Sequence, residues 1–399
     1  MLRLVPAALK RKLDSAVHRS TRIPYAGVPH EPDVFLRKTA RSKIIKKYLH
    51  KSLLLKVRGQ TRLEHRKAHT FRRILWIYTG KRNFGDATMD LSGRALLKGR
   101  DIEIDLFTLP TLHKLFHEDD VFRNVFHDLR EVESRQYDAV LMSEYNLPSI
   151  KLKSKYFKNL PFASLFRFFY GPDRNQTSFS YAAISDVFSL GYSEQEIAAL
   201  SKPYLASRAA TTHSVQAMLP EQRFIALAVG GLDANRTYRH WPELLDMIDR
   251  SNDATLPDRI VLLGSDNGQS MADALLGRTF KRLKVSSCVG TLSLLQSREV
   301  IAHASLFVGA DGGLMHVAHS TPAPSVSLFS NKEPPALRLT ERCNSIGIQS
   351  TGDVDDIAPN AVFDAIGKRL RQPLVGAGDI VELIGEIGEA GTLHEEVVA

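Results

Sequence analysis

Short apolar segments alternate with amphipathic segments in two separate stretches of the chain, and this alternation restricts the fold more than any other feature of the sequence. In the first stretch the apolar segments are residues 74–78, 101–109 and 137–145, and residues 88–98 have a helical pattern. Short runs rich in β-branched and aromatic residues are typical of buried strands. Strands that alternate with helices indicate βαβ units and a parallel sheet.

The second stretch begins near residue 222 and repeats the pattern. Its strands are predicted at residues 223–231, 259–265, 283–290, 305–313 and 323–330, and its helices at residues 240–250, 292–304, 314–320 and 353–372. The sequence therefore predicts an α/β protein of two Rossmann-like, doubly wound lobes that face each other across a cleft. Ligands of such sheets bind beyond the carboxyl ends of the strands.

The 399 residues are divided accordingly, with a join near residues 205–222, where the periodicity is lost. We expect a basic helical N-terminal extension at residues 1–71, a first lobe at 72–210, a second lobe at 222–352, a C-terminal helix at 353–372 and a peripheral tail at 373–399.

Positive charge is concentrated in the N-terminal extension. Residues 1–73 have a net charge of +16, whereas residues 74–399 have a net charge of −7. Such a segment is expected to bind a polyanion. Residues 43–59 can form a helix with Ile45, Leu49 and Leu53 along one stripe and lysines around it, which is typical of a helix on an anionic membrane surface. A solvated arm, or a helix docked on its own domain, is the alternative. Nucleic acid is not expected, because no nucleic-acid-binding module is recognisable.

Several classes of protein are disfavoured by what the sequence lacks. No apolar run reaches the roughly 18 residues of a membrane span. The N-terminus has no secretory signal, although its Arg-rich, acid-poor composition is also compatible with an organelle transit peptide. Two cysteines cannot form a disulfide framework or a four-cysteine zinc site. The usual motifs for nucleoside-triphosphate hydrolysis, NAD binding and zinc hydrolysis are absent.

The segment VGADGGLMH, residues 308–316, has the strongest chemical signal. Gly312 and Gly313 allow the backbone to approach a ligand, and the helix after them offers N–H groups to a diphosphate. His316 can donate a hydrogen bond to a phosphate or a sugar hydroxyl, and Asp311 can accept one from a hydroxyl. The alternatives are that Asp311 only caps the helix and that His316 is a packed core histidine.

A second segment, GGLDANRTYRHWP, follows a predicted strand and precedes a helix. Gly230 and Gly231 end the strand, and Arg236 and Arg239 can clamp a phosphate between them. Arginines on a solvated loop are the alternative.

A third segment, FGDATMD, also lies between a strand and a helix. Asp86 in this segment can take a proton from a hydroxyl group. Gly85 and Arg82 are assigned to the same side of the site. Gly-Asp is also ordinary turn and capping chemistry, so this segment alone does not identify a base.

Taken together, these segments resemble the ADP-heptose:lipopolysaccharide heptosyltransferases of glycosyltransferase family 9, over about residues 72–371. FGDATMDLSGRALL is similar to the family's N-terminal Gly-Asp loop and helix. GGLDANRTYRHWPELL is similar to its Lys-x-Trp-Pro segment, and FVGADGGLMHVAHSTPAPSVSLFS to its Asp-Thr/Ser-Gly-x-x-His signature. The resemblance implies a GT-B fold and an inverting glycosyltransferase that needs no metal and no cofactor.

The resemblance also implies a role for each matching residue. Asp86 looks like the catalytic base, and Arg239 stands where the family usually has a phosphate-binding lysine. Asp311, Gly313 and His316 match the signature, whereas Gly312 replaces its Thr or Ser. We therefore expect the donor diphosphate on residues 311–316, neutralised by Arg239 in the first place and by Arg236 as a second candidate.

The substrates implied are a nucleotide-diphosphate sugar, with ADP-heptose first among the donors, and a lipid-linked glycan of the lipopolysaccharide-core type. The N-terminal extension would hold the enzyme on the inner face of the cytoplasmic membrane. One alternative is the same fold with another nucleotide sugar, or with a protein or exopolysaccharide acceptor. The other is a non-catalytic protein, such as a pseudoenzyme, that binds membranes or polyanions.

Overall fold

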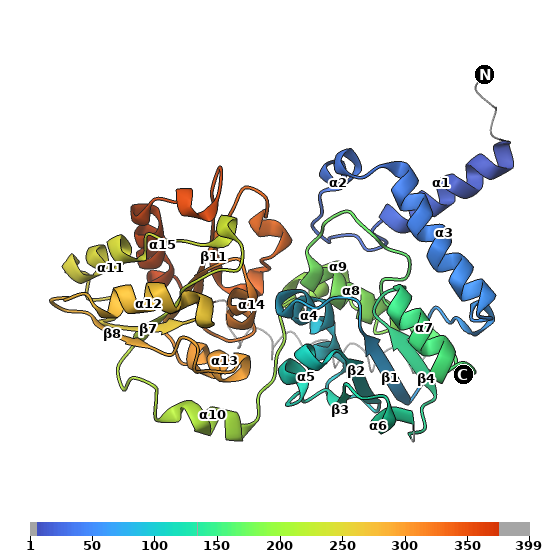
Figure 1. Cartoon of the computed structure of the whole chain (residues 1–399), viewed down its shortest axis with the longest axis horizontal. Helices are drawn as coiled ribbons and strands as arrows, with labels where there is room; N and C mark the ends of the chain where they lie inside the picture. The colour runs from blue at the N-terminus through green and yellow to red at the C-terminus, as the bar shows by residue number, and fades with distance from the viewer. Residues whose placement is uncertain (1–5, 134, 375–399) are drawn as a thin grey trace, which may run out of the picture.

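The computed structural model describes residues 6–133 and 135–374, which form two α/β lobes side by side (Figure 1). The N-lobe is built on a parallel sheet with the spatial order β3-β2-β1-β4-β5. Its strands are β1 (Arg73–Tyr78), β2 (Glu103–Thr108), β3 (Phe122–Phe126), β4 (Ala139–Met142) and β5 (Phe162–Ser164).

The C-lobe has a second parallel sheet, with the order β11-β10-β9-β6-β7-β8. Read from β8 to β11, this order is that of the N-lobe sheet with one more strand at the end, because β6 takes the place of β1 and β9 that of β4. Both sheets are therefore doubly wound, as predicted. The strands are β6 (Phe224–Ala228), β7 (Arg259–Leu263), β8 (Lys284–Ser287), β9 (Leu306–Ala310), β10 (Ser325–Phe329) and β11 (Ser345–Gln349).

Helices cover both faces of each sheet (Figure 1). Those of the N-lobe are α4 (Phe84–Leu91), α5 (Pro110–Phe116), α6 (Arg130–Glu133), α7 (Leu147–Tyr156), α8 (Gln176–Val187) and α9 (Glu194–Leu200). Those packed on the C-lobe are α10 (Ala209–Gln216), α11 (Trp241–Arg250), α12 (Gln269–Leu276), α13 (Leu294–Ala302), α14 (Gly313–His319) and α15 (Pro359–Arg371). The join between the lobes thus contains a helix, α10, which packs against α13.

Three strands, β3, β5 and β11, were not predicted from the sequence. All three lie at sheet edges. β5 has only three residues, and the residues of β11 are half-buried or exposed. Edge strands are buried on fewer sides than central ones, so they need no apolar run, and their sequences carry little periodic signal.

The helix that follows β1 begins earlier than predicted. We expected a helix over residues 88–98, but α4 starts at Phe84, and the chain continues as a 3₁₀ helix at Ser92–Leu97. The Ser92 hydroxyl donates back to the Thr88 carbonyl, and a Cβ on Gly93 would lie 2.4 Å from the backbone oxygen of Ser180 in α8. The tight approach of α8 ends the α-helix there. Asp86 therefore lies within the first turn of α4.

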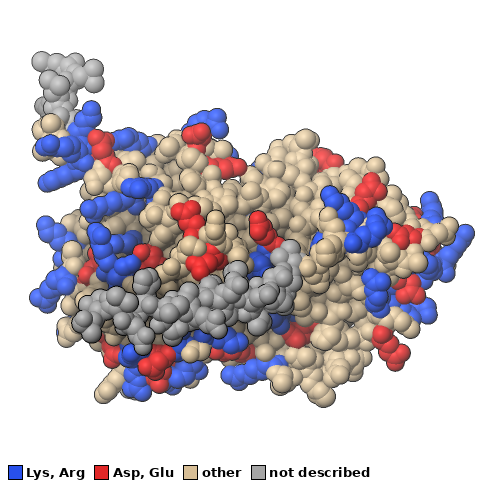
Figure 2. Space-filling view, turned by 180° about the vertical axis from the view of Figure 1, so that it is seen from behind, with Lys and Arg blue, Asp and Glu red and all other residues tan. Residues whose placement is uncertain are grey.

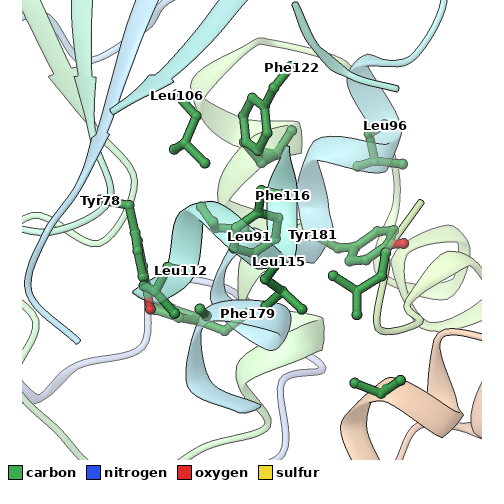
Figure 3. Packing of buried hydrophobic residues seen from close by; sticks show 14 of the residues in the cluster. Tyr78, Leu91, Leu96, Leu106, Leu112, Leu115, Phe116, Phe122, Phe179 and Tyr181 are labelled. Atoms are coloured by element: carbon green, nitrogen blue, oxygen red, sulfur yellow. The ribbon is translucent and has the colours of Figure 1, made fainter. Parts of the chain in front are cut away.

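A buried apolar cluster holds α4 on the N-lobe (Figure 3). Leu91 of α4 lies in this cluster with Leu112 and Phe116 of α5 and Phe179 of α8, and each of the four is at most 1% exposed. Dense packing of this kind leaves a helix little freedom to shift. The acidic first turn of α4 is thus fixed relative to β1 and α8.

The N-terminal extension forms three helices, α1 (Ala7–Thr21), α2 (Pro32–Lys38) and α3 (Arg41–Val57), on the outer side of the N-lobe (Figure 1). Ile44 and Leu55 of α3 are buried, and the ring of Tyr48 lies 4.5 Å from that of Phe168. The helix predicted over residues 43–59 is therefore docked on its own domain, which was one of the alternatives.

The outer face of α3 is apolar and basic. Leu49, Leu53 and Val57 are 50%, 60% and 73% exposed, and Lys46 and Lys56 are exposed beside them. Figure 2 shows Lys and Arg crowded at its left-hand edge, where the extension lies. Within residues 6–133 and 135–374, no helix is long and apolar enough to cross a membrane.

Candidate active site

The two lobes meet at the point in each sheet where successive strands stop being added on one side and begin to be added on the other. In the N-lobe this place lies between β1 and β4, and in the C-lobe between β6 and β9. In doubly wound sheets the ligand crevice lies at these points, beyond the carboxyl ends of the strands. Helices α4 and α14, which follow β1 and β9, contact each other across the lobes. The segments around Asp86 and Asp311 are thereby brought together.

The contact between the lobes is close at Gly85 and His316. A Cβ on Gly85 would lie 2.5 Å from Cδ2 of the His316 ring, and a Cβ on Gly313 would lie 4.0 Å from Cβ of Phe84. Two of the segments singled out in the sequence, 230 residues apart, thus form one site. We call it the inter-lobe site and define it by Asp86, Lys81, Asp90 and Gln176 of the N-lobe and by Arg236, Asp311, His316 and Arg338 of the C-lobe.

Asp86 is the partly exposed carboxylate of this site. Its Oδ1 accepts a hydrogen bond of 2.9 Å from Nε2 of Gln176 and lies 3.7 Å from Nζ of Lys81. Among the described residues, the only hydrogen-bond contact of its Oδ2 is one of 3.4 Å with the amide nitrogen of Asn83. Burial alone would raise the pKa of Asp86, but the Lys81 charge, the Gln176 hydrogen bond and more distant cations together hold it below its usual value. The group is therefore ionised and has one oxygen available.

Asp90 lies one helical turn beyond Asp86 and is buried. It accepts a 2.7 Å ion pair from Lys81 and a 3.1 Å hydrogen bond from the hydroxyl of Tyr78, and it lies 3.5 Å from the Gln176 amide. Burial raises the pKa of Asp90, and the nearby Lys81 opposes that rise. Burial by itself would lower the pKa of Lys81, but the two carboxylates raise it. Lys81 is thus the cation shared by the buried Asp90 and the partly exposed Asp86.

On the C-lobe side, Asp311 is a buried carboxylate without a hydrogen bond. Its oxygens lie 3.5 Å from Nε2 of His316 and 3.5 Å from a terminal nitrogen of Arg236, and neither oxygen has a hydrogen-bond partner within the part of the chain that the structure describes. The Nδ1 atom of His316 and the Nε atom of Arg236 also lack partners there. Buried polar groups are rarely left without partners. Their concentration here indicates a place for a polar ligand.

The same geometry decides between the alternatives for Asp311. The side chain does not cap α14, because the cap position is taken by Gly312 and no side chain bonds to the free N–H groups there. Burial alone would raise the pKa of Asp311, but His316 and then the arginines Arg338 and Arg236 lower it. The carboxylate is therefore charged and faces cations from two directions.

Arg338 links the two lobes electrostatically. It pairs with Glu333, whose other oxygen accepts a 2.9 Å bond from Arg236, and it lies 3.5 Å from a carboxylate oxygen of Asp173 in the N-lobe. Arg338 is also among the cations that lower the pKa values of Asp86 and Asp311. It therefore contributes positive charge to both halves of the inter-lobe site.

The two arginines of the second segment have different surroundings. Arg236 faces Asp311 and Glu333, whereas Arg239 bonds to Asp355 through its backbone nitrogen at 2.7 Å and its side chain at 2.8 Å. The Arg239 side chain is 57% exposed, against 33% for Arg236. In this structure Arg236, rather than Arg239, is the arginine of the inter-lobe site.

The glycines after β6 are required by the backbone. Gly230 has φ +90°, a left-handed conformation, and a Cβ there would lie 2.8 Å from Cα of Gly268. A Cβ on Gly231 would lie 2.5 Å from the hydroxyl of Thr237. Both positions therefore exclude larger residues and fix the path of the loop that carries Arg236.

The remaining predicted residues are less constrained. Gly312 has an extended backbone, and a Cβ on it would meet nothing closer than the Ala310 carbonyl at 3.8 Å. Close packing within the chain thus does not require glycine there. Arg82 is exposed in the loop before α4.

Four residues of the inter-lobe site were not singled out in the sequence. Lys81 and Asp90 flank Asp86, and an acidic pair four residues apart on one helix, beside a lysine, was a signal that could have been read. Gln176 and Arg338 have no such signal, because only the folded chain brings them to Asp86 and Asp311. Among the described residues, no group of three or more His, Cys, Asp or Glu side chains is arranged to hold a metal ion.

Comparison with solved structures gives the fold. A family 9 glycosyltransferase from Veillonella parvula matches with a TM-score of 0.61 and 14% identity, over 76% of this chain and 99% of that one. E. coli ADP-heptose lipopolysaccharide heptosyltransferase II matches with a TM-score of 0.55 and 19% identity, over 75% and 98%. E. coli heptosyltransferase WaaC, solved with ADP, matches with a TM-score of 0.52 and 16% identity, over 74% and 99%. The lobes are thus arranged as in GT-B heptosyltransferases.

The sequence comparisons give the family. No curated protein matches the chain at a significant level. The model of glycosyltransferase family 9 (heptosyltransferase) matches residues 126–351, which is more than half of the chain. This match runs from the last residue of β3 to just beyond β11 and includes Arg236, Asp311 and His316. The chain therefore belongs to glycosyltransferase family 9, and it is a glycosyltransferase.

Proposed function

We propose that the protein is an inverting transferase that moves a sugar, heptose from ADP-heptose in the first instance, onto a lipid-linked glycan. The observation that carries this proposal is the meeting of Asp86 with the Asp311–His316 segment at the two points of strand-order reversal. ADP-heptose is the donor to test first because it stands in the name of a similar enzyme, E. coli ADP-heptose lipopolysaccharide heptosyltransferase II.

Asp86 is the proposed base. The acceptor hydroxyl gives its proton to Asp86, its oxygen bonds to the anomeric carbon of the donor, and the bond from that carbon to the diphosphate breaks, so that the diphosphate leaves with the electron pair. The lowered pKa of Asp86 keeps it in the basic form near neutral pH. Attack from the N-lobe on a donor held by the C-lobe inverts the anomeric centre.

The donor is proposed to lie on the C-lobe. Arg236 and Arg338 would neutralise the leaving diphosphate, and the backbone of Gly312 and Gly313 would lie against it. Asp311 and His316, with their unpartnered polar atoms, are suited to sugar or ribose hydroxyls. Charge stabilisation by these side chains would allow transfer without a metal, and we expect turnover to persist in the presence of a chelator.

The acceptor is proposed to approach over the N-lobe while the extension rests on the anionic inner face of the cytoplasmic membrane. The exposed stripe of Leu49, Leu53 and Val57 on α3, with basic residues around it, supports this orientation. A lipid-linked glycan would then reach Asp86 without leaving the membrane surface.

The decisive experiment is Asp86→Asn in the full-length protein. Transfer from ADP-heptose to a lipopolysaccharide-core acceptor should fall by about 10²-fold or more, the usual contribution of a general base, while ADP binding measured by calorimetry is retained. Asp246→Asn, at an exposed ion pair of the C-lobe, is the matched control. Unchanged turnover in Asp86→Asn would remove the proposed mechanism, and a screen of other nucleotide sugars would test the donor separately.

A further inference from the structure

A lysine lies between two carboxylates directly beside the proposed base. Nζ of Lys81 is 2.7 Å from Asp90 and 3.7 Å from Asp86, and the two acids are one turn apart on the same face of α4. Like charges at this spacing repel each other. The positive charge of Lys81 therefore offsets the repulsion between the two acids.

A single amide ties the same two acids together from the other side. Nε2 of Gln176 lies 2.9 Å from Oδ1 of Asp86 and 3.5 Å from Oδ1 of Asp90, and the hydroxyl of Tyr78 completes the bonding of Asp90. The Asp90 side chain is 3% exposed, whereas that of Asp86 is 31% exposed. Asp90 is thus enclosed and cannot meet a substrate, while Asp86 can.

The two carboxylate oxygens of Asp86 have different contacts. Oδ1 is held by Gln176 and faces Lys81, whereas within the described part of the chain Oδ2 has only the long contact to Asn83. We propose that Lys81, anchored by Asp90, is a positioning residue that fixes the Asp86 carboxylate by Oδ1 and leaves Oδ2 to accept the proton of the acceptor hydroxyl. This inference rests on the proposed function, in which Asp86 is the base.

The proposal predicts in which direction the pKa of Asp86 changes when Lys81 is removed. The charged or titratable groups that act on Asp86 or are acted on by it include Lys81, Asp90, Tyr78, Arg174, His316 and Arg338. After the opposing effect of burial, Lys81 is the largest influence on the pKa of Asp86. A carboxylate base works only above its pKa, so activity is lost as pH falls through that value. Removing Lys81 should move this loss to higher pH.

The experiment is a ¹³C NMR titration of the Asp86 carboxyl in full-length, ligand-free protein labelled at aspartate, with the resonance assigned by Asp86→Asn. In Lys81→Met the midpoint should rise by about one pH unit, the lower end of the effect of a neighbouring cation. Lys81→Arg keeps the charge and should keep most of the lowered midpoint. Lys67→Met removes an exposed N-lobe lysine paired with Asp186 at 2.7 Å and should leave the midpoint unchanged.

Asp90→Asn separates the positioning role from a general loss of structure. It removes the anchor but leaves the lysine charge, so the Asp86 midpoint should stay or fall, while kcat falls because the lysine is no longer fixed. An unchanged midpoint in Lys81→Met, or a rise in Asp90→Asn, would overturn the inference. These outcomes are independent of the Asp86→Asn turnover that tests the proposed function, because the titration needs no substrate.

Discussion

Gly85 of the N-lobe lies directly against the imidazole of His316 in the C-lobe, and a Cβ placed on Gly85 would come within 2.5 Å of the ring. The ring belongs to the donor side and the glycine precedes the proposed base. The space between the two half-sites is thus set by the absence of a side chain at one position.

Gly85→Ala should therefore hold the lobes apart or displace His316. Overpacking of this kind costs about 1–3 kcal/mol, and every 1.4 kcal/mol corresponds to a factor of ten. We expect kcat/KM for transfer to fall about tenfold or more. Gly277→Ala, where a Cβ would make only an ordinary 3.4 Å contact, should leave kcat/KM unchanged. Equal activity of the two variants would contradict the closed arrangement.

The surroundings of the two arginines predict different effects on donor binding. Arg236 is partly buried beside Asp311, whereas Arg239 is more exposed and paired with Asp355. Hydrogen bonds to charged groups contribute about 1.5–3 kcal/mol, so Arg236→Gln should raise the Kd of ADP-heptose by about 10- to 100-fold. Arg239→Gln should raise it by less than about threefold. Calorimetry on both variants checks the prediction, and a larger loss in Arg239→Gln would show that the donor recruits that arginine on binding.

The outer stripe of α3 predicts how the protein meets a membrane. The double variant Leu53→Glu/Val57→Glu should weaken binding to phosphatidylglycerol vesicles about tenfold or more, because it removes apolar contact area and adds negative charge. Turnover of a soluble acceptor should not change, since both side chains point away from the N-lobe. Leu276→Glu, at a 45% exposed position on α12, is the control. Equal vesicle binding by the double variant and the control would exclude α3 as the contact.

The sequence was sufficient for the fold because the central strands are apolar runs that end in glycine loops, as at β1 and β9. The sequence was less informative about features that depend on tertiary contacts, such as helix boundaries and the choice of site residues. Helix α4 begins before the predicted boundary, so the one-turn spacing of Asp86 and Asp90 on a helix was not used. The choice between Arg236 and Arg239 depends on Asp355, which lies 116 residues from Arg239 and is predicted by no local pattern.

The sequence resemblance predicts that Gly312 occupies the position of a Thr or Ser, and the surroundings of Gly312 predict what a hydroxyl there would do. The backbone there is extended, and a Cβ would meet nothing within 3.4 Å, so Gly312→Ser should fold as the native protein does. If the diphosphate lies on this segment, the added hydroxyl can donate one hydrogen bond, with a net contribution of about 0.5–1.5 kcal/mol. The Kd of ADP-heptose should then fall about two- to tenfold in Gly312→Ser and not in Gly312→Ala, which adds the Cβ alone. A Kd that rises equally in both variants would mean that the ligand needs the space itself, and the diphosphate would then lie closer to the backbone than a side chain permits.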